Sequence, residues 1–289
     1  MSGERKYIFV LATIAVFFII FELASPEKTN WNITYHKNDK NPYGSYLIHE
    51  RLPDLFEKVN HSYSTIYELA DTVQGDLFVL SQQFNPSKED VKALLKYISK
   101  GNNALIASSF FDKEGFLDTL DLSTDYFLID NIIMEGKEFT DSVDVSFTKP
   151  NKLDPAKFSF DSDAINTYFQ SSNNFEILAS LDELPVFIEK DHGVGKLYLC
   201  TIPIAFTNNY LLHEQTDILI SQMFSHLPYG DFTWTEYYQI GRLEARTPLR
   251  YILSEEALKM AYYLILISLG FFIFFEIKRK QRIIPVIPP

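Results

Sequence analysis

Two long uncharged stretches stand near the ends of the chain, and strand-like and helix-like patterns alternate between them. Residues 8–21 read IFVLATIAVFFIIF, and residues 260–275 read MAYYLILISLGFFIFF. Each run is apolar on every helical face, which is typical of a membrane-spanning helix. Basic residues lie outside both runs, at 5–6 and within 278–282. This placement predicts that both termini are cytoplasmic.

The two runs predict a division of the chain into five segments. A cytoplasmic N-terminus covers residues 1–7, and a transmembrane helix, read as an uncleaved signal anchor, covers residues 8–24. An extracytoplasmic α/β domain covers residues 25–258, a second transmembrane helix covers 259–276, and a basic cytoplasmic tail covers 277–289.

Within the domain, buried strands alternate with helices. Residues 76–81 (DLFVLS) and 104–108 (ALIAS) are short apolar runs typical of strands buried on both faces. Apolar residues at positions 91, 94, 95 and 98 predict a helix between them, capped by Asn85 and followed by Gly101. Strand, helix and strand in this order predict parallel pairing through a right-handed crossover.

Weaker signals complete the expected topology. Residues 112–163 are interpreted as an inserted or edge β region, and Gly193 and Gly195 predict the turn of a hairpin. Further strands are expected at residues 31–35, 175–179, 185–189 and 196–201, and helices at 45–56 and 209–224. The predicted fold class is α/β, a doubly wound and mostly parallel sheet with an inserted β region, flanked by two transmembrane helices.

Composition excludes several classes of function. The 289-residue chain has 26 Lys+Arg and 38 Asp+Glu, a formal net charge of -12, so duplex nucleic acid is not an expected partner. A single cysteine excludes an internal disulfide and multi-cysteine metal centres. Aromatic residues near Phe206, Tyr210 and Trp234 are interpreted as core rather than pocket.

Three stretches together resemble one bacterial family: residues 41–46 (NPYGSY), 193–212 (GVGKLYLCTIPIAFTNNYLL) and the segments 236–242, 248–253 and 278–285. The chain is similar to a Bacteroidetes-type membrane-protein family of unknown function. Its ectodomain is of the class I glutamine-amidotransferase-like, or flavodoxin-like, type. The resemblance implies a bacterial inner-membrane location with a periplasmic domain. It also implies MoxR-type AAA ATPases and neighbouring membrane proteins as partners, because their genes commonly lie beside those of the family.

The nucleophile of a class I amidotransferase is not found. That chemistry needs a cysteine on a sharp turn after a buried strand, but Ser108 and Ser109 follow residues 104–107 instead. Cys200 lies inside a predicted strand, where we expect a small buried side chain. A serine hydrolase would use Ser108 or Ser109 with a histidine and a carboxylate, drawn from His192, His213, Asp112 and Asp217. No recognisable motif joins these residues, so a non-catalytic pseudoenzyme is the preferred hypothesis.

No metal or cofactor is expected. Asp191 with His192, and His213 with Glu214 near Asp217, are isolated pairs without metal-site spacing. The carboxylates at positions 118, 121 and 125 lack the spacing of a calcium loop. These groups are interpreted as parts of a solvated acidic surface.

Loops at the strand ends are the candidates for contact with an unidentified small-molecule ligand. In a doubly wound sheet, ligands bind beyond the carboxyl ends of the strands. The candidate residues are Tyr43, Gly44, Ser45, Ser108, Ser109, Thr207, Asn208 and Asn209. The alternative is that Ser45 and Asn208 or Asn209 cap helices, which explains their polarity without a ligand.

The preferred function is that of a membrane-anchored extracytoplasmic binding or scaffold protein in an ATPase-linked envelope complex. One alternative is an accessory subunit of an ABC-type transport or gliding system. The other alternative is a serine hydrolase of the cell envelope.

Overall fold

A computed structural model shows how the chain folds. It describes residues 17, 29–127, 142–148, 157–161, 165–170, 174–181, 183–212, 216–241, 249, 252–253 and 256–280. The first apolar run, residues 8–21, lies outside the described residues except for Phe17.

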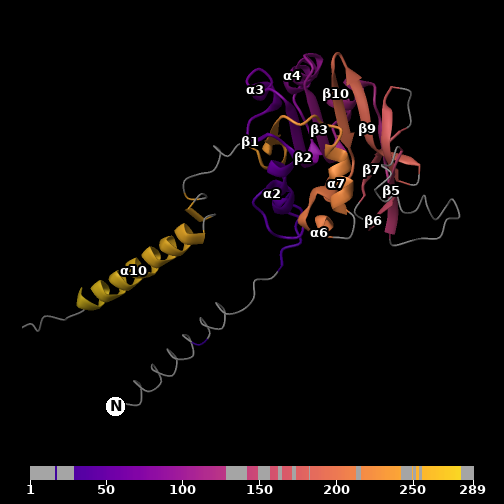
Figure 1. The fold of residues 1–289 in the computed structure, drawn as a ribbon. Helices are drawn as coiled ribbons and strands as arrows, with labels where there is room; N and C mark the ends of the chain where they lie inside the picture. Colours follow the sequence, from indigo (N-terminus) through magenta and orange to yellow (C-terminus); the bar gives the residue numbers. More distant parts are fainter. Residues whose placement is uncertain are drawn as a thin grey trace, which may run out of the picture.

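A nine-stranded sheet forms the centre of the domain, in the order β1-β11-β2-β3-β10-β9-β8-β5-β6 (Figure 1). Its first half is parallel throughout. The strands of this half are β1 (Lys58–Ser62), β11 (Asp231–Thr235), β2 (Asp76–Phe84), β3 (Asn103–Phe111) and β10 (Gly195–Cys200). The parallel pairing of β2 with β3 confirms the predicted strand–helix–strand unit.

The second half of the sheet is antiparallel throughout. It holds β9 (Leu184–His192), β8 (Glu176–Leu181), β5 (Ser142–Phe147) and β6 (Lys157–Asp161). The predicted β9–β10 hairpin is confirmed, and its turn includes Gly193 at φ 68°. This hairpin reverses the strand direction, and the inserted strands then extend the same sheet. The sheet is therefore mixed, and the prediction of a mostly parallel sheet is wrong.

A small second sheet pairs β4 (Thr124–Tyr126) with β7 (Thr167–Phe169) in antiparallel fashion. Residues 31–35 do not form the expected strand; Trp31 is 60% exposed, and β1 takes the edge position of the sheet. The expected helix at 209–224 is split into α6 (Asn208–Leu211) and α7 (Thr216–Phe224).

Helices cover both faces of the parallel half. Helix α2 (Tyr46–Leu55) packs with α7 over Phe78, Leu80 and Trp234. On the other face, α3 (Ile66–Leu69), α4 (Lys88–Ser99) and the short helices η1 (Lys113–Leu117) and η2 (Asp118–Leu120) cover Leu77 and Val79. Alternate residues of β2 therefore enter two separate cores, as expected for a strand buried on both faces.

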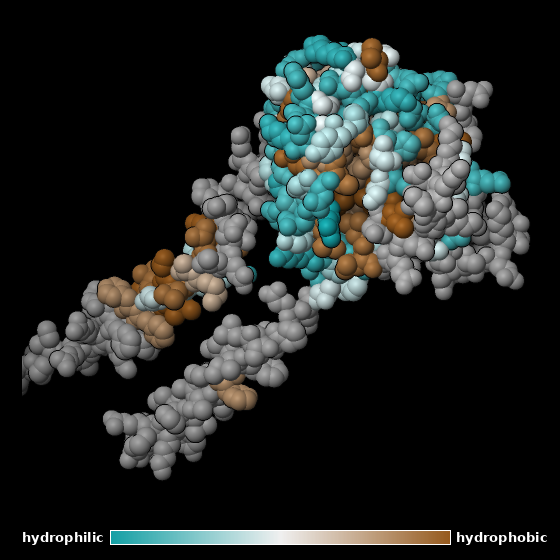
Figure 2. Space-filling view, in the orientation of Figure 1, coloured by the Kyte–Doolittle hydropathy of each residue, from teal (hydrophilic) through white to brown (hydrophobic). Residues whose placement is uncertain are grey.

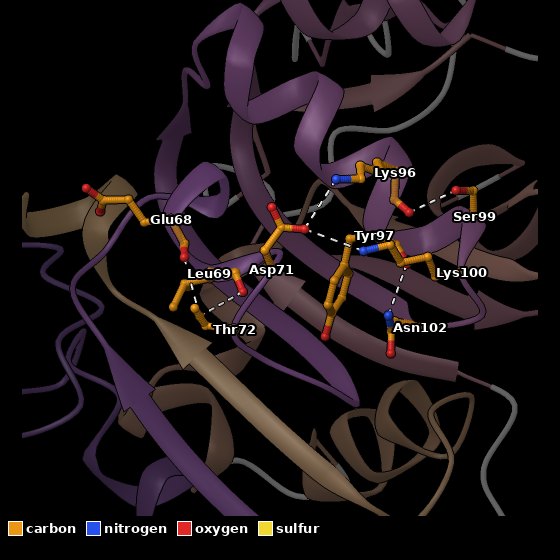
Figure 3. Close-up of polar contacts among 9 residues, drawn as sticks. All are labelled: Glu68, Leu69, Asp71, Thr72, Lys96, Tyr97, Ser99, Lys100 and Asn102. Carbon is orange, nitrogen blue, oxygen red and sulfur yellow. Dashed lines mark hydrogen bonds and ion pairs between the residues drawn. The ribbon is translucent and has the colours of Figure 1, made fainter.

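Helix α4 is fixed at both ends by polar contacts. Ser87, rather than the predicted Asn85, caps its N-terminus in a reciprocal capping box with Asp90. Figure 3 shows Asp71 between Lys96 and Lys100, with O–N distances of 3.3 and 3.5 Å. The Tyr97 hydroxyl donates to the Gly75 carbonyl at 2.7 Å, which ties the helix to the start of β2.

No helix in the described part of the chain is long and apolar enough to cross a membrane. Helix α10 (Glu256–Lys280) contains the second apolar run. Its uncharged stretch, residues 260–275, extends about 24 Å at 1.5 Å per residue, against about 30 Å for a bilayer core. The two predicted flanking transmembrane helices, and the inner-membrane location inferred from them, are therefore wrong for the described residues. Figure 2 shows the apolar surface of α10, where Leu264 and Phe272 are exposed.

A buried carboxyl group at the start of β2 makes the stability of the fold depend on pH. Asp76 is 2% exposed and accepts a hydrogen bond of 2.9 Å from the Asn103 side chain. Burial raises the pKa of Asp76 from 3.8 to about 6, although the Asn103 hydrogen bond opposes this shift. The folded state therefore favours the protonated acid.

We expect Asp76→Asn to stabilise the protein at neutral and alkaline pH. A raised folded-state pKa gives stability that is complete below about 3.8 and is lost as the pH rises through about 6. The substitution removes this loss of unfolding free energy, which is on the order of 2–3 kcal/mol at pH 8. The difference in stability between the variant and the wild type should shrink as the pH falls from about 6 to about 4. Urea denaturation across this range measures the effect. Parallel pH profiles for the two proteins would contradict the prediction.

Candidate functional site

Polar residues that do not belong to the two cores lie at the carboxyl edge of the sheet, where the parallel strands end. Strands β1, β11, β2, β3 and β10 all end at this edge because they run in the same direction. It is the edge at which doubly wound folds bind ligands. The loop before α2 and the loop before α6 both reach it, as the sequence predicts (Figure 1).

Asn208 joins these two loops. Its side-chain Oδ1 accepts the Leu47 N–H at 2.8 Å, and its Nδ2 donates to the carbonyls of Asp39 and Asn41 at 2.8 and 2.7 Å. Its backbone N–H donates to the Gly44 carbonyl at 2.8 Å. At 5% exposure, this side chain is committed to holding the loops, so Asn208 is a structural residue rather than a ligand contact.

The other candidate residues of these loops also take part in close packing or in hydrogen bonds within the domain. A Cβ atom on Gly44 would lie 2.1 Å from the Asp39 carbonyl oxygen, so the closed loop requires glycine. The Tyr43 carbonyl accepts the N–H of Tyr35, and the Asn209 N–H donates to the Pro42 carbonyl. The Thr207 hydroxyl donates to the Ile204 carbonyl, in the short helix η4 (Pro203–Phe206), at 2.7 Å.

The predicted capping roles are reassigned. Ser45 is the N-cap residue of α2, but its side chain makes no capping hydrogen bond. The side chain of Asn208 caps α2 instead, through the Leu47 N–H, and not its own helix. No capping role is seen for the side chain of Asn209.

Ser108 and Ser109 are buried at the end of β3. The Ser108 hydroxyl donates to the Phe110 carbonyl at 2.8 Å and lies 3.3 Å from the Ser81 hydroxyl. The Ser109 side chain is hydrogen-bonded to the hydroxyl of Tyr35, whose pKa is raised by burial. Neither serine is more than 3% exposed. Both are placed as packing and hydrogen-bonding groups rather than as exposed nucleophiles.

The two proposed partners of these serines that the structure describes, His192 and Asp112, make other contacts. His192 pairs with Gly195 at the opposite edge of the sheet, and Asp112 accepts the Gly115 N–H at 2.8 Å. His213 and the side chain of Asp217 lie outside the described residues. The described residues therefore do not assemble a serine triad, which requires a histidine within hydrogen-bonding reach of the nucleophile.

Cys200 is fully buried, as predicted. Burial raises the pKa of its thiol to about 12, although a hydrogen bond with the backbone of Ile202 opposes the rise. A thiol in this state supplies almost no thiolate near neutral pH, so the residue does not act as an amidotransferase nucleophile. Among the described residues, no group of three or more His, Cys, Asp or Glu side chains is placed to hold a metal ion.

An open polar pocket lies at the same edge, where β2 ends beside α8 (Tyr237–Ile240). It has a volume of about 430 Å³, and we call it the amide–tyrosine pocket. The described residues that line it are three glutamines, an asparagine, two tyrosines and a glycine, and none of these is charged: Gln82, Gln83, Asn85, Tyr237, Tyr238, Gln239 and Gly241.

Specific contacts hold the two walls of this pocket together. The Gln82 N–H donates to Gln239 Oε1 at 2.8 Å, and the Ile66 N–H donates to the Tyr238 hydroxyl at 2.9 Å. The rings of Phe84 and Tyr238 meet edge to face with centroids 4.8 Å apart. The side chains of Gln83 and Tyr237, in contrast, make no hydrogen bond within the described part of the chain.

The region beside the pocket contains a buried ion pair and a histidine pair. Glu236 is 1% exposed; its Oε1 accepts the Lys37 N–H at 2.9 Å, and its Oε2 lies 3.7 Å from Lys37 Nζ. The rings of His49 and His61 lie 4.7 Å apart. Burial, followed by the charge of Lys37, lowers the pKa of His61 to about 4, so the His61 side chain is neutral at pH 7.

An apolar groove of about 540 Å³ lies between α2 and α7. Leu47, Leu55, Leu211 and Ile220 line it, and Arg51 and Asp54 stand at its side. Figure 2 shows apolar surface over α6 and α7 on this face of the domain. Its lining is mostly aliphatic, whereas that of the amide–tyrosine pocket is mostly amide and tyrosine.

Sequence reasoning did not find the amide–tyrosine pocket. Gln82 and Gln83 interrupt the apolar run of β2 at its end, which is the one local signal for an exposed strand end. Gln239, which accepts the Gln82 N–H, lies 157 residues further along the chain, after a strand, β11, that was not predicted. The prediction that Phe206, Tyr210 and Trp234 are core residues is confirmed.

Comparisons with known proteins identify no family. No protein-family model and no curated protein matches the chain. Solved structures match weakly. The N-terminal domain of mmIFT52 is 13% identical with a TM-score of 0.46, covering 66% of this chain and 91% of that one.

A β-galactosidase from Bacillus circulans sp. alkalophilus is 10% identical with a TM-score of 0.33, covering 53% of this chain. The match spans only 23% of that enzyme. A cytoplasmic protein of Salmonella typhimurium LT2 is 11% identical with a TM-score of 0.34, covering 58% of this chain and 77% of that one. Likenesses this weak carry no argument about function, and the resemblance to the Bacteroidetes-type family stays a prediction.

We expect Asn208→Ala to destabilise the domain and Asn209→Ala to leave it nearly unchanged. The first change removes three side-chain hydrogen bonds and leaves buried backbone groups unpaired, which should cost about 2–4 kcal/mol. The second residue contributes its backbone N–H, which alanine retains. Urea denaturation of both variants tests this role, and equal stabilities would refute it.

Proposed function

We propose that the chain is a non-catalytic binding domain that recognises its ligand or partner at the amide–tyrosine pocket. The observation that carries this proposal is a contrast along one edge of the sheet. The potential nucleophiles Ser108, Ser109 and Cys200 are buried and engaged there. The amide and tyrosine side chains beside them line an open pocket.

The expected partner system is an ATPase-linked complex with a MoxR-type AAA ATPase. Only the family resemblance supports this part of the proposal. The alternative partner, also from that resemblance, is a permease of an ABC-type transport or gliding system.

We expect a photo-crosslinker placed at Gln83 in intact cells to capture a specific partner or ligand. Gln83 lines the pocket and is exposed, so a bound molecule would lie within reach of a benzoylphenylalanine side chain. The matched control position is Val194, which is 83% exposed at the turn on the opposite edge of the sheet. Mass spectrometry identifies the adducts.

An adduct formed at position 83 and not at position 194 supports the binding site. A MoxR-type ATPase in that adduct supports the ATPase-linked complex, whereas a permease supports the transport alternative and overturns the ATPase assignment. Identical adducts at both positions, or none at either, would overturn the proposed site.

We expect no labelling of the full-length chain by a fluorophosphonate probe. Such a probe reacts with a serine activated by a neighbouring base, and Ser108 and Ser109 are buried without a histidine partner among the described residues. Gel fluorescence compares the wild type with Ser108→Ala and Ser109→Ala. Labelling that disappears in either variant would establish the serine-hydrolase alternative.

A further inference from the structure

The lining of the amide–tyrosine pocket restricts the charge of its ligand. The described residues of the wall include no lysine, arginine or histidine, so they offer no counter-charge to a phosphate or carboxylate. The same residues include no aspartate or glutamate, so they offer no carboxylate to a metal ion or an amine. The net charge of -12 further disfavours anions. The site therefore fits a neutral ligand.

The polar groups of the wall suit a ligand that carries many hydroxyl groups. Each glutamine or asparagine amide offers both N–H donors and a carbonyl acceptor, and a hydroxyl group also donates and accepts. Gln82, Gln83 and Asn85 place three such amides on consecutive or nearly consecutive positions at the end of β2. Their side chains make no hydrogen bond in the described part of the chain, so they are available to a ligand.

Tyr237 provides an aromatic surface in the same pocket lining as these amides. Its ring stands at 84° to that of Tyr238, with centroids 5.2 Å apart, and remains half-buried. Tyr238 is itself fixed by the Ile66 N–H and by Phe84. A tyrosine ring held in this way is pre-organised to pack against the C–H face of a sugar ring while its hydroxyl reaches a polar group.

A peptide segment fits this pocket less well. Peptides commonly add a strand to a free sheet edge or insert side chains into apolar pockets. Strand β3 pairs with one side of β2, and β11 pairs with the other side only from Asp76 to Val79. Beyond Val79, at the pocket, the Gln82 N–H is already bonded to the Gln239 side chain, so an added peptide strand would have to displace this contact. The tyrosine rings supply the only large apolar surface among the lining residues.

We propose that the amide–tyrosine pocket binds a neutral saccharide, with Tyr237 as the stacking platform and the amides of Gln82, Gln83 and Asn85 as the hydroxyl-recognising groups. This proposal rests on the proposed binding function and names its ligand class. The volume of about 430 Å³ falls in the range of about 300–1,000 Å³ usual for small-molecule sites.

A glycan array with neutral and anionic glycans, probed with the full-length chain, provides the test. Isothermal titration with the best neutral glycan then compares the wild type with Tyr237→Ala, Tyr237→Phe and Gln83→Ala. The matched control is Tyr229→Ala, which removes a tyrosine that is 74% exposed and does not line the pocket.

We expect binding to neutral glycans and a loss of at least about tenfold in affinity for Tyr237→Ala. Tyr237→Phe should stay within about threefold of the wild type because the ring remains, and Gln83→Ala should lose several-fold. Tyr229→Ala should bind as the wild type does. Circular dichroism and urea denaturation confirm that each variant is folded.

Absence of binding to every neutral glycan would overturn the saccharide proposal, as would binding that is unchanged in Tyr237→Ala. A preference for anionic glycans would also overturn it. These failures differ from failure of the proposed function: a crosslinked protein at position 83 with no glycan binding leaves the binding domain intact and rejects only the saccharide. Failure of both experiments rejects the site itself.

Discussion

Burial of the central strands on both faces is the constraint on which the rest of the structure depends. Strands β2, β3 and β10 lie inside the sheet, with helices over both sides of the parallel half. Their middle residues must therefore be apolar, and the side chains at alternate positions pack into two separate cores. Polar side chains are tolerated only where these strands end, so any chemistry of this half of the domain is concentrated at the strand ends.

The carboxyl edge divides into two kinds of polar group. One kind is structural: Asn208 closes two loops over α2, and Ser108 and Ser109 satisfy neighbouring groups. Buried polar atoms need such partners, because an unpaired one costs about 1–3 kcal/mol. The other kind surrounds an open pocket in which the side chains of Gln83 and Tyr237 make no hydrogen bond to another described residue. The proposed binding function rests on these pocket residues.

The sequence predicted the parts of the fold that local pattern determines. The strand at 76–81, the strand at 104–108 and the helix between them have strong apolar periods, and all three are present. Strands β1 (KVNHS) and β11 (DFTWT) are short and partly polar, and their identity depends on pairing across more than 170 residues. The mixed sheet was missed for a related reason, because the order in which inserted strands join an edge has no local signal.

Site prediction failed where it depended on residues distant in sequence. The principle that ligand-binding loops lie at the carboxyl ends of parallel strands correctly placed the loops at 41–45 and 207–209 at one edge. It did not show that Asn208 would use both its amide oxygen and its amide nitrogen to join them. Hydrogen–deuterium exchange of the full-length chain, with and without the neutral small-molecule fraction of a cell extract, tests the central claim most directly. We expect slower exchange at residues 82–85 and 237–241. Slowing confined to other segments, or no slowing at all, would contradict it.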